Sequence, residues 1–245
     1  MSRAAARRRL IFPLDVDTVR EADRLVRLLA GEVGMFKIGK QLFVHAGPAV
    51  VRRVHAAGGE VFLDLKFHDI PRTVALASVE ATRLGVRMFN VHAAGGREMM
   101  ATTAAEVAAV CRRERLRRPI LLGVTVLTSL GDGDLRAVGV AGGAARQVAR
   151  LAKLARGSGM DGVVASPREV RAIRRACGPR FVIVTPGVRQ ATDAAGDQKR
   201  VETPEAAMRA GADYLVVGRP IRGAADPVAA ARGIVAAMAR GLAGR

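Results

Sequence analysis

The sequence feature that most constrains the fold is a regular alternation of short apolar runs with longer stretches of helical pattern. Eight times along the chain, an apolar run typical of a buried strand is followed by a stretch with helix-start or helix-stop signals. Thr18 and Glu21, for example, form a capping box after the first apolar run. Eight strand–helix units in about 235 residues match the count and size of a (β/α)8 barrel. The sequence therefore predicts an α/β fold, a (β/α)8 TIM barrel in a single domain. The predicted strands are 10–14, 35–38, 61–65, 88–91, 120–126, 163–165, 181–184 and 214–217.

The chain divides into a short basic tail and a single barrel domain. Residues 1–9 are polar, basic and without hydrophobic period, so we expect a flexible, frayed N-terminal tail there. Residues 10–245 form the barrel domain, because no linker-like stretch interrupts the alternation. Residues 157–162 match the pattern G-x-G-x-x-G, but they leave a predicted helix and enter a predicted strand. A dinucleotide-binding fingerprint does the reverse, so we interpret this segment as a turn.

Composition argues against a membrane or secreted protein. Hydrophobic residues make up 50% of the chain, enough for a substantial core. The longest apolar run, 120–127, is interrupted by a glycine and falls short of the roughly 18 residues of a membrane span. Pro13 and Asp15 break the apolar stretch after the N-terminal arginines, so we expect no signal peptide. Cys111 and Cys177 lack metal-ligand spacing and indicate reduced thiols, which favours a cytoplasmic location.

The formal net charge is +18, from 40 Lys and Arg against 22 Asp and Glu. Such a balance can indicate nucleic-acid binding. The arginines, however, are spread over nearly every helical stretch, and the chain has one Tyr and no Trp to stack on bases. We therefore favour attraction of an anionic substrate, or solubility. A nucleic-acid-binding protein remains the rival from a different class, and salt-dependent retention on DNA would support it.

Three charged residues follow one another closely at the end of the third predicted strand. Alternate side chains of a strand share a face, so Asp64 and Lys66 are expected to point the same way. Asp69 lies beyond the apolar run, on the loop that Pro71 closes. Such charges cost free energy unless they neutralise one another or act on a ligand. A surface ion pair with a helix-capping Asp69 is the simpler alternative for this triplet.

Polar or charged residues also end most of the other predicted strands. In a (β/α)8 barrel these ends meet at one face, where the active site lies. Phosphate commonly binds at the loops after the last two strands, and Gly218–Arg219 stands there with a close backbone approach and a bidentate guanidinium. The loop from Pro186 to Gln198 is polar enough to serve as a closing lid. The residues concerned are Asp15, Lys37, Asp64, Lys66, His92, residues 125–129, residues 186–189, Gly218 and Arg219.

In these segments the chain resembles the orotidine 5′-phosphate decarboxylase family, in its stand-alone bacterial type. The matching segments occur in family order and run from Leu14 to the terminal helix. Pro13 departs from the family pattern; because proline lacks an N–H for a parallel ladder, we expect the first strand to be frayed or shortened there. The matching segments are DLKFHDIP at 64–71, KIGK at 37–40, NVHAAGG at 90–96, VTVLTS at 124–129, PGVR at 186–189, GDQ at 196–198 and VGRP at 217–220.

The resemblance implies roles for individual residues. Decarboxylation of orotidine 5′-phosphate leaves an electron pair at ring C6, and Lys66 would stabilise it and donate the proton. Asp64 would lie near the departing carboxylate, and Lys37 and Asp69 would complete a Lys-Asp-Lys-Asp network. The implied catalytic residues are thus Lys66, Asp64, Asp69 and Lys37, and the implied substrate-binding residues are Asp15, Lys37, Ile70, Thr73, Thr128, Pro186, Arg189, Gln198, Gly218 and Arg219.

The resemblance further implies a homodimer, no metal and no cofactor. Asp69, Ile70 and Thr73 resemble residues that the family contributes to its partner's site. His68 beside Asp69 could suggest a metal, but no further ligand cluster completes a set, so we favour structural hydrogen bonding for His68 and His92. The alternative enzyme is a Mg-dependent sugar-phosphate decarboxylase or synthase of the same barrel superfamily, which would share the Asp-x-Lys-x-x-Asp segment.

Overall fold

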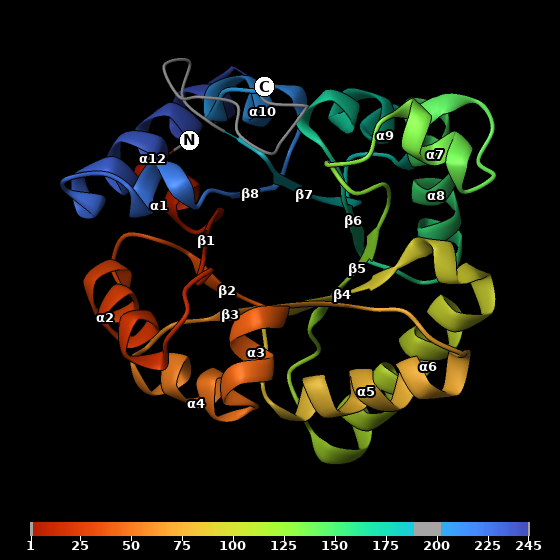
Figure 1. Cartoon of the computed structure of the whole chain (residues 1–245), viewed down its shortest axis with the longest axis horizontal. Coiled ribbons are helices and arrows are strands. Elements are labelled where there is room, and N and C mark those ends of the chain that lie inside the picture. The colour runs from red at the N-terminus through yellow and green to blue at the C-terminus, as the bar shows by residue number, and fades with distance from the viewer. Residues whose placement is uncertain (1, 189–201, 245) are drawn as a thin grey trace.

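The computed structural model of the chain describes residues 2–188 and 202–244. Eight parallel strands close into a barrel in the order β1 to β8, with helices around the outside (Figure 1). The predicted (β/α)8 barrel is therefore confirmed, and strand boundaries differ from the predicted ones by at most two residues. The strands are β1 (Leu10–Pro13), β2 (Met35–Gly39), β3 (Val61–Phe67), β4 (Met88–His92), β5 (Ile120–Val124), β6 (Gly162–Val164), β7 (Val182–Pro186) and β8 (Tyr214–Val216).

Helices fill the connections between successive strands. The Thr18 hydroxyl accepts the Glu21 N–H at 3.2 Å, as the predicted capping box requires. The Asp226 carboxylate caps the last helix in a similar way. The helices are α1 (Arg3–Arg7), α2 (Val19–Leu29), α3 (Lys40–Ala46), α4 (Ala49–Ala56), α5 (Pro71–Arg83), η1 (Ala93–Gly95), α6 (Gly96–Glu114), α7 (Asp132–Ala137), α8 (Gly143–Gly157), η2 (Pro167–Glu169), α9 (Val170–Cys177), α10 (Pro204–Ala210), α11 (Arg219–Arg222) and α12 (Pro227–Ala243). None of the helices among the described residues is both long and apolar enough to cross a membrane.

The start of the chain differs from the frayed tail expected for residues 1–9. Arg3–Arg7 form the helix α1, which packs against α12 and buries Ala6 completely. The Arg7 guanidinium donates to the Gly31 carbonyl at 2.5 Å. A five-residue helix is too short to show a hydrophobic period, and its stability comes from packing on the barrel rather than from its own sequence. The polar, basic composition of residues 1–9 therefore gave no indication of this packing.

Two other local predictions have clear outcomes. Residues 157–162 connect the end of α8 at Gly157 to the start of β6 at Gly162, so the G-x-G-x-x-G segment is a turn as predicted. The first strand is not shortened at Pro13, which pairs with Lys37 of β2. The Leu14 N–H donates to the Lys37 carbonyl at 2.8 Å, so the ladder to β2 continues past the proline that cannot donate.

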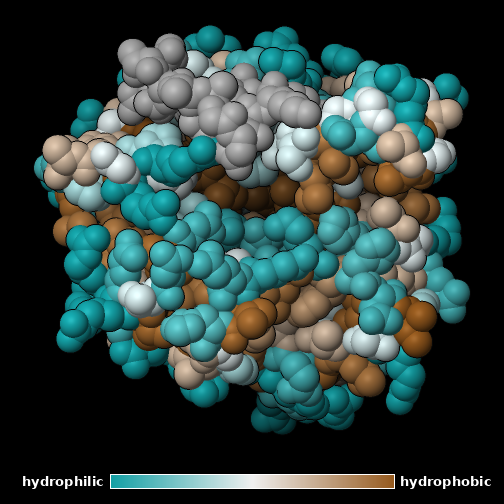
Figure 2. Space-filling view, in the orientation of Figure 1, coloured by the Kyte–Doolittle hydropathy of each residue, from teal (hydrophilic) through white to brown (hydrophobic). Residues whose placement is uncertain are grey.

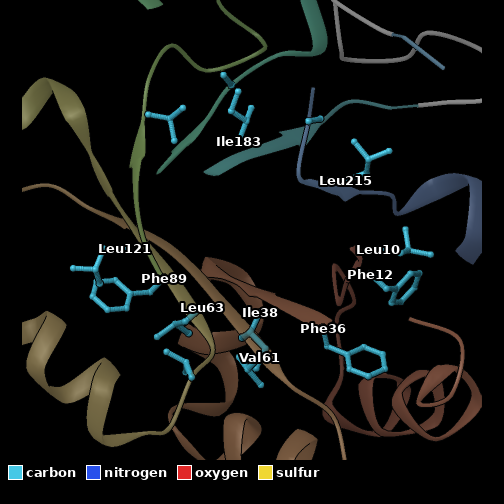
Figure 3. Close-up of a cluster of buried hydrophobic side chains, with 14 of the residues drawn as sticks. Leu10, Phe12, Phe36, Ile38, Val61, Leu63, Phe89, Leu121, Ile183 and Leu215 are labelled. Carbon is cyan, nitrogen blue, oxygen red and sulfur yellow. The ribbon is translucent and has the colours of Figure 1, made fainter. Parts of the chain in front are cut away.

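The core consists of two layers separated by the barrel wall. One layer lies between the strands and the helices and includes Phe12, Phe36, Leu63 and Phe89, whose side chains point away from the barrel axis (Figure 3). The other layer fills the barrel interior with alternate residues of the same strands. Because both faces of every strand are covered, most strand residues are apolar; Lys37, Asp64 and Asn90 are polar exceptions inside β2, β3 and β4. The interior layer comprises Ile11, Met35, Phe62, Met88, Leu122, Val184 and Val216.

Candidate active site

A pocket of about 480 Å³ opens at the carboxyl ends of the barrel strands. Figure 2 shows a hollow in the centre of the face that is viewed down the barrel, with hydrophobic residues in its depth and hydrophilic residues beside it. The pocket brings together predicted site residues from six separate strands or strand ends. These residues are Asp15, Lys37, Asp64, Lys66, Thr128, Pro186, Gly218 and Arg219.

The end of β3 departs from regular strand geometry at Lys66. This residue has φ +52°, a left-handed conformation that costs a non-glycine residue about 1–2 kcal/mol. The register between β3 and β4 shifts between Leu63 and Phe67, which places Lys66 in a bulge. The Lys66 ammonium lies 2.7 Å from Asp64 Oδ1, so the two charged groups meet as the alternation predicted. In this distorted backbone the Lys66 side chain lines the pocket.

Asn90 of β4 holds this bulge in place. Its side chain is completely buried, accepts the Lys66 backbone N–H at 2.8 Å and donates to Asp64 Oδ1 at 2.7 Å. One amide therefore orients both the lysine backbone and the carboxylate. The sequence signal for this role is a polar residue in the middle of an apolar strand, and the motif NVHAAGG, which contains Asn90, did not by itself predict it.

Asp64 lies between two ammonium groups. Lys37 Nζ lies 3.2 Å from Asp64 Oδ2 and, on its other side, 3.2 Å from Asp15 Oδ1. Burial alone would raise the pKa of Asp64, but the Lys37 and Lys66 charges outweigh it and hold the pKa below its ordinary value. Burial opposes the charge of Lys37 in the same way, and the Asp64 and Asp15 carboxylates raise the pKa of Lys37 above its ordinary value. The row Asp15–Lys37–Asp64–Lys66 is therefore alternately charged.

The remaining walls of the pocket divide into an apolar part and a cationic part. Phe62, Val124 and Val164 offer apolar surface beside the charged row, and Thr128 places a hydroxyl at the edge of this part. Such a wall can hold a planar ring and hydrogen-bond one of its edges. The apolar part therefore suits a heterocycle.

The cationic part follows β8. Gly218 leaves room for the ring of Pro13, because a Cβ on this glycine would lie 2.7 Å from Pro13 Cγ. The short helix α11 begins directly afterwards at Arg219 and contains Arg222, and both arginines line the pocket. Arg222 also donates to the Asp15 carbonyl, which links this end to β1. Arginines at this position are suited to a phosphate group.

The structure does not bring every predicted site residue into the pocket. Asp69, Ile70 and Thr73 are exposed at the start of α5 and do not line it. The Asp69 carboxylate accepts its neighbour's N–H, from Ile70, at 2.6 Å. Within this one chain, the charged row ends at Asp15, which lies beside Lys37, and does not include Asp69. Arg189 and Gln198 lie outside the described residues.

His68 and His92 lie close together near this site. Their ring centroids are 5.2 Å apart. Burial lowers the pKa of His92 to about 4, and the nearby His68 and Lys66 add to this effect. Among residues 2–188 and 202–244, no group of three or more His, Cys, Asp or Glu side chains could hold a metal ion.

Fold and pocket together define a class: a (β/α)8-barrel enzyme with an alternately charged row of Asp and Lys at the carboxyl ends of its strands. The sequence model described as "Orotidine 5′-phosphate decarboxylase / HUMPS family" matches residues 8–234. The chain belongs to this family, which confirms the resemblance found in its motifs.

Relatives and solved structures agree with this membership. Orotidine 5′-phosphate decarboxylase of Syntrophotalea carbinolica is 58% identical over 237 residues and is matched over 97% of both chains. The protein of the same name from Geobacter sulfurreducens is 55% identical over 235 residues, covering 96% of this chain and 98% of that one. The crystal structure of orotidine 5′-phosphate decarboxylase from Lactobacillus acidophilus aligns with a TM-score of 0.82 and 37% identity, over 94% of this chain and 98% of that chain.

Proposed function

We propose that this chain decarboxylates orotidine 5′-phosphate to uridine 5′-phosphate and CO₂ in de novo pyrimidine biosynthesis, without a cofactor. The observation that carries the proposal is the Lys66 ammonium, held 2.7 Å from a buried Asp64 carboxylate inside a pocket with apolar and cationic walls. Relatives that are 52–58% identical bear the name of this activity. The charge pattern of the pocket and the membership of the family therefore both support the proposed reaction.

In the chemical step, the bond between C6 and the carboxylate carbon breaks and its electron pair stays on C6. Lys66 stabilises that carbanion electrostatically and then transfers a proton from Nζ to C6. A fixed cation suits this reaction, because the electron pair lies in the ring plane and no carbonyl can delocalise it. The ammonium is already oriented by Asp64 and by the bulge that Asn90 supports, so little reorganisation is needed.

The other pocket residues bind the substrate in this proposal. Asp15 and Lys37 hold the ribose hydroxyls, Thr128 contacts the amide edge of the pyrimidine, and Arg219 grips the phosphate. Pro186 and Gly218 shape the ends of the pocket beside them. The resemblance assigns phosphate and base contacts also to Arg189 and Gln198.

We further propose a homodimer in which each chain completes its partner's site. Asp69, Ile70 and Thr73 are exposed beside their own pocket, and Ile70 leaves 67% of its surface accessible in the single chain. An exposed isoleucine next to an exposed carboxylate is suited to a contact with a second copy. Asp69 would then supply the fourth charge of the Lys-Asp-Lys-Asp network. A cytoplasmic location fits the two unpaired cysteines.

One assay separates the proposal from the Mg-dependent sugar-phosphate alternative. Purified protein is mixed with orotidine 5′-phosphate after exhaustive chelation, and loss of the orotate absorbance is followed. We expect undiminished turnover with chelator, because Lys66 provides the cation beside C6. Activity that disappears with chelator and returns with Mg²⁺, or activity only on sugar phosphates, would contradict the proposal.

A further inference from the structure

A second cavity lies at the opposite end of the barrel from the active site. It has a volume of about 540 Å³ and is lined by residues that stand at or just before the starts of the strands. It is as large as the active-site pocket, at about 480 Å³, which accommodates a nucleotide in the function proposed above. The lining residues are Ala5, Arg8, Arg9, Gly34, Met35, Glu60, Arg87, Arg117, Val182, Asp213 and Tyr214.

The N-terminal segment forms one side of this cavity. Ala5 of α1 and the two arginines that follow α1 line it. The segment is held closely, because a Cβ on Gly34 would collide with the Arg8 carbonyl group. The Gly34 N–H also donates to the Leu10 carbonyl at 2.8 Å. The backbone on both sides of Arg9 is thus held against the barrel, and Arg8 and Arg9 line the cavity.

Both carboxylates of the cavity already have cationic partners. Arg117 lies 2.8 Å from Glu60, and Arg9 lies 3.5 Å from Asp213. Asp213 is bound more closely by Arg174, at 2.7 Å, which does not line the cavity. The acidic groups are therefore neutralised by other arginines and leave the cavity positively charged.

Arg8 and Arg87 remain without a carboxylate partner among the described residues. Arg87 is half-buried and Arg8 is exposed, and both line the same cavity. The amino-terminal face of such barrels usually serves stability, and ion pairs such as Arg117–Glu60 fit that role. Arg8 and Arg87 carry like charges on one cavity, and no ion pair among the described residues accounts for either of them.

We propose that this cavity is a second binding site, specific for a small anion that carries two or more phosphate groups. Guanidinium groups bind phosphate oxygens bidentately, and two free arginines match two phosphates. The half-buried ring of Tyr214 also lines the cavity and offers a stacking surface for a base. An inorganic polyphosphate and a nucleoside triphosphate share the required chemistry.

Calorimetric titration tests the proposal with inorganic tripolyphosphate and with adenosine triphosphate as probes. The protein is saturated with uridine 5′-phosphate so that the active site is occupied. We expect one site per chain in the wild type, and at least about tenfold weaker binding in Arg8→Gln/Arg87→Gln, because two charge-assisted contacts are lost. Orotidine 5′-phosphate turnover should be unchanged in this variant, which shows that it folds. If the double variant does not fold, Arg8→Gln alone, at an exposed position, replaces it.

The matched control is Arg150→Gln/Arg171→Gln, which removes the same charge from exposed positions on α8 and α9. It should bind tripolyphosphate as the wild type does. Equally weakened binding in both double variants would show that binding depends only on the net charge of +18, and it would overturn the proposal. Absence of tripolyphosphate binding to the wild type at low salt would also overturn it. Tyr214→Leu separates the two ligand sources: weaker binding of adenosine triphosphate alone supports a nucleotide, and unchanged binding of both probes supports the inorganic anion.

Discussion

Replacement of Asn90 by alanine should damage both the stability and the catalytic step. The variant loses a hydrogen bond to the Asp64 carboxylate and leaves the Lys66 backbone N–H without its acceptor. A hydrogen bond to a charged group contributes about 1.5–3 kcal/mol, and a buried unsatisfied donor costs about 1–3 kcal/mol. We therefore expect the free energy of unfolding to fall by roughly 3 kcal/mol. If the less well oriented Lys66 also stabilises the transition state by about 2 kcal/mol less, kcat/KM falls about 30-fold.

Urea unfolding and steady-state decarboxylation measure the two effects. Ser78→Ala is the matched control, because Ser78 is equally buried but its hydroxyl has no hydrogen-bond partner in the described structure. It should lose neither stability nor activity. An Asn90→Ala protein with wild-type stability and wild-type kcat/KM would refute the claim that Asn90 supports the left-handed Lys66.

Three further predictions follow from the site. Arg219→Ala should raise KM and lower kcat in steady-state assays, because phosphate binding contributes to the chemical step. For the same reason the nucleoside orotidine should be a very poor substrate of the wild type. Unchanged kinetics in the variant would show that Arg219 does not bind the phosphate. Lys66→Ala and Asp69→Ala should each be nearly inactive as homodimers. Co-refolding the two variants in equal amounts should restore up to roughly a quarter of wild-type activity, since about half the dimers are mixed and each mixed dimer has one intact site of two. Mixed dimers that remain inactive would disprove the shared site. Because the pKa of His92 is lowered from 6.5 to about 4, the unfolded chain binds more protons between these values, so the free energy of unfolding should decrease as pH falls through this window. A His92→Gln protein should show a flatter pH dependence in urea unfolding; an unchanged slope would contradict the assigned pKa.

The barrel could be predicted because its signals are local and repeated. Apolar runs of strand length and residues such as Thr18 and Asp226 place each element without knowledge of its neighbours. The meeting of Asp15, Lys37, Asp64 and Lys66 followed from topology, since parallel strands end at one face.

Other features depend on tertiary contacts and left no comparable pattern. The left-handed Lys66 lies inside a run that alternates like an ordinary strand, and its hydrogen bond to Asn90 across the sheet supports the bulge. Helix α3 begins immediately at the end of β2, at Lys40, without a side-chain cap. The ordering of Arg3–Arg7 requires the surface of α12, which a sequence of five residues cannot indicate.

The central claim is that the Lys66 ammonium serves as both the cation and the proton donor at C6. The most direct measurement is single-turnover decarboxylation by Lys66→Ala, with occupancy of the site verified by separate titration with uridine 5′-phosphate. Lys153→Ala, which removes an exposed lysine from α8, is the control. We predict that the Lys66 variant still binds nucleotide but decarboxylates at least about 1,000-fold more slowly, a loss of roughly 4 kcal/mol of transition-state stabilisation, whereas the control reacts as the wild type does. A nucleotide-bound Lys66→Ala protein that turns over within about tenfold of the wild-type rate would contradict the account.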